Sequence, residues 1–253
     1  MNDKTFLVLD LETTGLDPKA DKIIEIGAVL HTKNGKQAEY SQLVNPGIPI
    51  PRFITELTGI TREMVQSDKA LPVQDALEEF RAFLSKELNQ SSHPANIKDL
   101  PVTGHNVGFD LSFLREEGAL KDNPAIDTYD LASVILPGEG RYNLRALGQV
   151  LGVPKRATHR ALDDTLVTLA IFKIMYEKIL QLPLPTLIEI IRLAEDIPWK
   201  GTLPFLWALE ERKKGESGSR RGYLSQQGDD GRERGCFRLL FRRNIRSRNY
   251  RQV

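Results

Sequence analysis

The chain has 253 residues, of which 40% are hydrophobic and 27% are charged, which is the composition of a globular protein. It holds no apolar run long enough to span a bilayer, and its first residues lack the basic and then apolar pattern of a signal peptide. We therefore expect a cytoplasmic protein that does not bind membranes. Cys236 is the only cysteine, which excludes an intramolecular disulfide and a zinc site built on thiolates.

The formal net charge is only +1, but the charges are distributed unevenly along the chain. Residues 212–253 contain thirteen Lys and Arg but only four Asp and Glu, so the rest of the chain is acidic. We divide the chain into a domain at 1–182, a helical extension or linker at 183–214, and a basic tail at 215–253. The tail has little apolar periodicity, so we expect it to be disordered, either as an arm for an anionic partner or as an end with no evolved role.

The first part of the chain predicts an antiparallel meander of three strands. Residues 5–12 and 22–32 are rich in strand-forming residues. The pair Asn34-Gly35 is a strong hairpin signal, and a third strand follows through residues 40–44. Three prolines within residues 45–51 then exclude a central strand or a helix interior.

Helices and two more strands follow the meander. Apolar spacing predicts short strands at 100–104 and 125–128, each leading into a helix, with Asp127 or Thr128 as the cap of the second. Other helices are predicted at 53–57, 61–65, 71–88 and 144–151, after His159 through Leu180, and within 183–213. This order predicts an α/β protein with a mixed five-stranded sheet, in which parallel strands follow the antiparallel meander, flanked by helices.

Two acids stand at the end of the first predicted strand, in the run Asp10-Leu11-Glu12-Thr13-Thr14-Gly15. Residues two apart in a strand point to the same side, so Asp10 and Glu12 face one point in space. Two carboxylates in an apolar setting repel unless a cation lies between them, and a divalent metal ion is the simplest partner. The alternative is an exposed edge strand with two solvated acids.

Three other residues offer metal-binding or proton-transfer groups. Asp110 follows a strand and a Gly-His-Asn turn, His159 precedes the long helix, and Asp164 lies in that helix's first turns. Each has an ordinary explanation by itself, because an Asp at a helix start is often a cap and a lone His is often a surface residue. Asp163 points about 100° away from Asp164, so only one of the two can face the site.

Taken together, these residues form three motifs that resemble those of the DEDDh 3′–5′ exonucleases, the family of the proofreading exonuclease of replicative polymerases. The order and separations match along roughly residues 5–181, and no catalytic position is missing. The resemblance implies a ribonuclease H-like fold. The motifs read Asp10-Leu11-Glu12-Thr13-Thr14-Gly15, Gly104-His105-Asn106-Val107-Gly108-Phe109-Asp110 and His159-Arg160-Ala161-Leu162-Asp163-Asp164.

The resemblance also implies a mechanism. Asp10, Glu12, Asp110 and Asp164 would bind two divalent ions, Mg²⁺ or Mn²⁺, which prefer such oxygen ligands. The ions would lie about 3.5–4 Å apart, one activating water and the other stabilising the leaving 3′ oxygen. His159 would be the general base. The reaction would release nucleoside 5′-monophosphates from a 3′ end, in DNA proofreading or repair.

The substrate contacts implied by the resemblance are less specific. Thr13, Thr14 and Gly15 lie where the family contacts the terminal nucleotide. Asn106 could hold its turn or contact that nucleotide. Four apolar residues could pack on the terminal bases or equally belong to the core: Leu57, Ile60, Met64 and Phe109.

The expected partners are single-stranded or frayed 3′ ends of nucleic acid, DNA in preference to RNA, and a polymerase or a helicase. Two alternatives remain open from the sequence. One is an exoribonuclease that acts on RNA ends or short oligoribonucleotides, because the active-site residues are the same for both nucleic acids. The other is a catalytically silent nucleic-acid-binding module of the same fold.

Overall fold

A computed structural model describes residues 1–218 except 2, 34, 91–94, 196 and 198. The predicted meander is confirmed: β1 (Phe6–Thr13) pairs antiparallel with β2 (Ile23–His31), and β2 pairs antiparallel with β3 (Gln37–Asn45). Asn34 of the predicted hairpin lies outside the described residues. Its neighbour Gly35 has a φ of 76°, which glycine adopts readily, and donates its N–H to the Thr32 carbonyl.

The sheet has six strands among the described residues, in the order β4-β3-β2-β1-β5-β6, and not the five predicted. The missed strand is β4 (Ala70–Pro72), which pairs parallel with β3 at the edge of the sheet. Three residues are too few to show a strand pattern, and the sequence Leu71-Pro72 instead resembles the start of the following helix. On the other side of β1 lie β5 (Val102–Gly104) and β6 (Ala125–Asp127), both parallel, as predicted.

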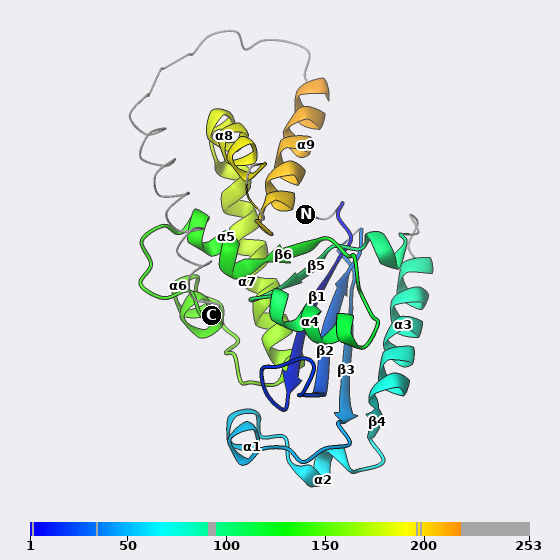
Figure 1. The fold of residues 1–253 in the computed structure, drawn as a ribbon. Helices are drawn as coiled ribbons and strands as arrows, with labels where there is room; N and C mark the ends of the chain where they lie inside the picture. Colours follow the sequence, from blue (N-terminus) through cyan, green and yellow to red (C-terminus); the bar gives the residue numbers. More distant parts are fainter. Residues whose placement is uncertain (2, 34, 91–94, 196, 198, 219–253) are drawn as a thin grey trace.

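Helices cover both faces of the sheet (Figure 1). One face packs on α3 (Val73–Asn89) and α4 (Gly108–Glu116), and the single-turn η1 (Ile97–Asp99) precedes β5. The other face packs on a second group of helices: α5 (Thr128–Ile135), α6 (Leu144–Val150) and the long α7 (Ala161–Gln181). Two short helices, α1 (Arg52–Thr58) and α2 (Arg62–Val65), close one end of the sheet.

The extension after the sheet domain forms α8 (Leu184–Ala194) and α9 (Thr202–Gly218), which lie beside each other and against α7 (Figure 1). The Trp207 ring lies 6.3 Å from that of Tyr176 in α7, and the Tyr176 hydroxyl donates to Glu211 at 2.6 Å. α9 continues past residue 215, where the tail was expected to begin, and residues 219–253 lie outside the described part. Among the residues that the structure describes, no helix is long and apolar enough to cross a membrane.

Candidate active site

The direction of Asp10 and Glu12 follows from the alternation of β1. Leu7, Leu9 and Leu11 belong to the core under α3 and α4, whereas Phe6 and Val8 belong to the core under α7. Because strand side chains alternate, Asp10 and Glu12 continue the row of Phe6 and Val8 on the α7 side. The two acids therefore lie where β1 leaves the core and its partner helix begins.

The first turns of α7 rest directly on β2. A Cβ at Gly27 would overlap the backbone of Ala161, so only glycine permits this approach. The Thr165 hydroxyl donates to the Gly27 carbonyl at 3.0 Å and secures the contact. This backbone-to-backbone contact places Asp164, which is buried, beside the acids of β1.

A buried acid in β2 holds the residue before α7. Glu25 accepts hydrogen bonds from Nε and Nη2 of Arg160 and, at 2.9 Å, from the Ala161 N–H. Glu25 was not predicted from the sequence. The available signal was an acid inside the otherwise apolar run Ile23-Ile24-Glu25-Ile26, since a buried acid needs a partner.

Three predicted residues meet closely at this end of the sheet. One ligand atom each of Glu12, His159 and Asp164 lie within 4.8 Å of one another. His159 is exposed and has a φ of 56°, in the left-handed region that non-glycine residues seldom adopt. Asp164 Oδ1 accepts the Thr158 N–H at 2.8 Å, which ties the loop carrying His159 to the helix carrying Asp164.

Asp110 joins the cluster from α4. Its side chain is 3% exposed, and its Oδ1 accepts the Leu11 N–H, between Asp10 and Glu12, at 3.0 Å. The N-cap position of α4 is Val107, so Asp110 is not the cap that the sequence allowed as an alternative. A hydrogen bond across 99 residues of sequence instead fixes this carboxylate next to β1.

The four carboxylates are held in an environment that disfavours their charge. Burial and then the Asp110 carboxylate raise the pKa of Asp10 well above its usual range. Burial and then Asp164 raise the pKa of Glu12 to about 8, and burial raises the pKa of Asp110 to about 8. Burial also raises the pKa of Asp164. A cation among these groups would offset both burial and mutual repulsion.

The donor set fits a divalent metal ion. Four carboxylates supply only oxygen atoms, the ligands that hard divalent cations prefer, and His159 adds a nitrogen at the margin. The raised pKa values indicate that the charge of the cluster is uncompensated by the protein itself. Asp10, Glu12, Asp110 and Asp164 are therefore the residues that could hold such an ion.

The turn before α4 is fixed by Asp127. Its Oδ1 accepts the N–H of Asn106 and that of Tyr129, each at 3.0 Å, so it caps α5 and holds the turn together. Asn106 has a φ of 66° and is exposed, and its backbone serves the turn. Of the two caps that the sequence allowed, Asp127 is the one observed, although its contact with Asn106 had no sequence signal.

The predicted substrate residues of the first motif lie in a tight turn after β1. The Thr13 hydroxyl donates to the Gly15 carbonyl at 2.6 Å, and the Thr14 hydroxyl contacts Asp21 at 3.1 Å. Both threonines are buried. A side chain at Gly15 would overlap the Asp21 carboxylate, so this turn is built closely on itself.

The apolar substrate candidates separate into core and surface residues. Ile60 is fully buried with Ile24 and Ile54, so it is a core residue. Leu57 is 50% exposed, Met64 and Phe109 are half-buried, and the Phe109 ring contacts Phe113 at 5.1 Å. Two more exposed apolar residues were not predicted from the sequence: Leu16, which follows β1, at 83% exposure and Phe53 of α1 at 62%.

Comparison with protein-family models matches residues 7–172 to the family described as Exonuclease. DNA polymerase III PolC-type of Thermotoga maritima is 36% identical over 219 residues, 84% of this chain and 15% of that protein. The 3′-5′ exonuclease DinG of Bacillus subtilis is 37% identical over 202 residues, 77% of this chain and 20% of that protein. The chain thus spans a fifth or less of these relatives. DNA polymerase III subunit epsilon of Treponema pallidum is 34% identical over 177 residues, 67% of this chain and 75% of the subunit.

Solved structures show the same fold. Exonuclease X in complex with 5′ overhanging duplex DNA has a TM-score of 0.50 and 25% identity, covering 68% of this chain and 92% of that one. The nuclease domain of 3′hExo, a DEDDh family member bound to rAMP, has a TM-score of 0.52 and 20% identity, covering 67% and 91%. The expected ribonuclease H-like architecture is confirmed.

Proposed function

The chain belongs to the exonuclease family, and we propose that it is a metal-dependent 3′–5′ exonuclease that releases nucleoside 5′-monophosphates from DNA. One observation carries the proposal. Carboxylates from β1, α4 and α7 converge at one end of the sheet, and ligand atoms of Glu12, His159 and Asp164 lie within 4.8 Å of one another. Acids that are buried without a cation destabilise a protein core, so packing alone does not explain this arrangement.

We propose two divalent ions, Mg²⁺ or Mn²⁺, held by Asp10, Glu12, Asp110 and Asp164. When bound, such ions supply an activated water and charge stabilisation for the leaving 3′ oxygen. The chain's own part is to hold the ligands in place. The Leu11 N–H orients Asp110, and the Thr158 N–H orients Asp164, so each of these two carboxylates keeps one oxygen engaged by the protein.

His159 is the proposed general base. It is exposed beside Glu12 and Asp164, where it can take a proton from the attacking water and pass it to solvent. Its position depends on Arg160, the next residue, which is clamped by Glu25. The proposed base is thus an exposed imidazole next to a residue that is held by an ion pair.

The 3′ end of the substrate would lie over the exposed apolar residues near the site. Leu16, Phe53 and Leu57 offer surfaces on which bases can stack without sequence preference, the usual mode for single strands. Met64 and Phe109 are half-buried and would contact the terminal base only partly, while Asn106 and the Thr13–Gly15 turn would shape the sugar site. Frayed or single-stranded ends fit such a surface.

A labelled oligonucleotide tests the proposal. A 5′-labelled single strand of DNA should shorten stepwise from its 3′ end with Mg²⁺ or Mn²⁺ and stay intact with EDTA, and chromatography should identify 5′-monophosphates. A matched RNA strand gives the comparison between the two nucleic acids. Faster shortening of RNA would identify an exoribonuclease. Binding without shortening under either metal would identify a silent binding module.

The biological setting follows from the relatives only as a proposal. Relatives carry the names DNA polymerase III PolC-type, 3′-5′ exonuclease DinG and DNA polymerase III subunit epsilon, and these names support a setting beside DNA synthesis. We propose that this chain acts in proofreading or repair in the cytoplasm, alongside a polymerase or a helicase. Co-purification of the full chain with a replicative polymerase would support the first association.

A further inference from the structure

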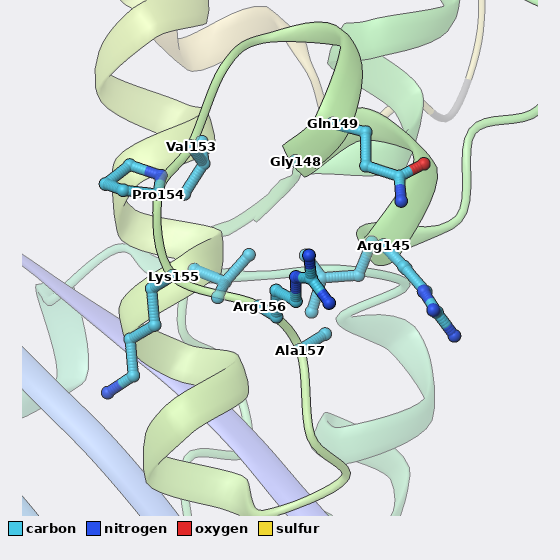
Figure 2. A pocket seen from close by; sticks show the side chains of 10 residues that line it. Arg145, Gly148, Gln149, Val153, Pro154, Lys155, Arg156 and Ala157 are labelled. Carbon is cyan, nitrogen blue, oxygen red and sulfur yellow. The ribbon is translucent and has the colours of Figure 1, made fainter.

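A pocket outside the carboxylate cluster lies between α6, the start of α7 and the segment 153–157 that joins them (Figure 2). Its volume is about 230 Å³. The inner wall is apolar and includes Leu144, Val153, Ala157 and Val167. A cavity of this size with an apolar wall can receive one flat ring of a small molecule or of a nucleotide.

The rim of the pocket is cationic. Arg145 comes from α6 and Arg156 from the joining segment, and Gln149 lies beside them (Figure 2). The lining includes no Asp or Glu. Within the described part of the chain, neither arginine forms an ion pair. Two guanidinium groups that line one pocket without a carboxylate repel each other. An anion bound between them would attract both and offset this repulsion.

The third cation of the pocket connects it to the active site. Lys155 points away from the two arginines toward α7, and its Nζ lies 2.8 Å from Asp163, the residue before Asp164. Arg156 precedes His159 by three residues, a backbone path of at most about 11 Å. The pocket therefore lies next to the site and within reach of a strand bound there.

We propose that this pocket binds a second nucleotide of the substrate, with Arg145 and Arg156 on its phosphodiester and the apolar wall against its base or sugar. The inference rests on the proposed function and specifies how the enzyme holds nucleic acid beyond the cleaved bond. A guanidinium donates two parallel hydrogen bonds to one phosphate, which a lysine cannot do. The pocket would thus fix the course of the strand relative to His159.

The test compares the double variant Arg145→Ala/Arg156→Ala with the control Arg81→Ala/Lys86→Ala. The control residues are exposed on α3, which covers the opposite face of the sheet from α6 (Figure 1). Binding of a labelled 12-nucleotide DNA strand is measured in EDTA, so that no hydrolysis occurs, over a range of salt concentrations. Loss of the contact with one phosphate should reduce the slope of log K against log [salt] by about 0.7. Affinity should fall by roughly tenfold or more, while the control variant keeps both values.

A second measurement separates this inference from the proposed function. The p-nitrophenyl ester of thymidine 5′-monophosphate holds one nucleotide and cannot reach the pocket from the active site. With Mn²⁺, the arginine double variant should hydrolyse it at the wild-type rate but show a raised KM for the 12-nucleotide strand. If the wild-type protein hydrolyses neither substrate, the proposed function fails. If it hydrolyses both, and the double variant keeps the wild-type slope, affinity and KM, only the pocket assignment fails.

A lysine double variant shows whether the pocket needs the guanidinium fork. Arg145→Lys/Arg156→Lys keeps both charges, so it should restore the salt slope while recovering only part of the lost affinity. Equal affinity of the lysine and alanine variants would contradict a phosphate contact. Melting curves of all variants confirm folding, which these exposed substitutions should not disturb.

Discussion

Glu25 in β2 and Arg160 before α7 form a two-pronged ion pair, with 2.6 Å between Glu25 Oε1 and Arg160 Nη2. The pair spans 135 residues of sequence and is adjacent to His159. This pair therefore holds the backbone next to His159, the proposed general base, in place. Glu25 touches no reacting atom, so its part is to position the residues that do.

Glu25→Ala should destabilise the protein by about 1–3 kcal/mol, because it removes the partner of Arg160 and of the Ala161 N–H. Urea unfolding measures the loss. The matched control is Glu56→Ala, which breaks the exposed pair with Arg52 and should cost less than about 1 kcal/mol. The Glu25 variant should also lower kcat, since His159 loses its anchor. Equal losses of stability in the two variants would contradict a structural role for the Glu25 pair.

His159→Ala should keep the fold and metal binding but lower kcat by about 10²–10⁴-fold, the usual contribution of a general base. Release of mononucleotides from a DNA strand measures kcat, and calorimetric titration with Mn²⁺ measures metal binding. His159 is exposed, so the melting temperature should change little. A variant that turns over at the wild-type rate would remove His159 from the mechanism.

Asp10→Ala should abolish hydrolysis and weaken Mn²⁺ binding by at least about tenfold, since even residues that only orient metal ligands cost that much. Asp163→Ala is the control. Asp163 is one residue from Asp164, yet its carboxylate is engaged by Lys155 at 2.8 Å and by the Thr158 hydroxyl at 2.9 Å, so its loss should leave Mn²⁺ affinity nearly unchanged. An unaltered titration for Asp10→Ala would count against its ligand role.

The metal-free protein should become less stable as the pH rises from about 4.5 to about 8. Burial and neighbouring carboxylates raise the pKa of Glu12 from 4.5 to about 8, and burial raises that of Asp110 to about 8. In this window the native state binds more protons than the unfolded chain, so stability falls with pH. Each tenfold difference in proton affinity between the folded and unfolded states corresponds to about 1.4 kcal/mol.

Thermal unfolding in EDTA across this pH range measures the effect. Added Mn²⁺ should raise the melting temperature most at the high end of the window, where the carboxylates are ionised. A flat or rising stability profile in EDTA would show that the cluster does not carry the raised pKa values.

Phe53→Ala should raise KM for single-stranded DNA by about fivefold or more, because stacking on one base contributes about 1–3 kcal/mol. The side chain is 62% exposed, so stability should be nearly unchanged. Ile188→Ala, at a similarly exposed apolar residue of α8, is the control and should leave KM unaltered. A KM increase shared by both variants would indicate a general surface effect.

Local patterns in the sequence were enough for the meander, most helices and the facing of Asp10 and Glu12, because alternation along β1 determines which side chains point toward α7. β4 was not predicted, because three residues beside a proline are too few to show the alternation of apolar and polar residues in a strand. The role of Glu25 was not predicted, because its partner is far away in sequence and no local pattern pairs an acid in a strand with Arg160. The left-handed conformations of Asn106 and His159 were equally hidden, since tertiary contacts impose them on residues that do not favour them.

The contact of α7 with Gly27 also determines when the site can assemble during synthesis. Glu12 leaves the ribosome 152 residues before Asp164, a delay of about 8–30 s at ordinary rates of translation. Until α7 docks on Gly27, the strand acids have no helix partner and the proposed base has no anchor. We therefore expect the nascent chain to be unable to hydrolyse nucleic acid until α7 has docked. A chain that ends before residue 158 should accordingly release no nucleotides from a strand that the full chain degrades.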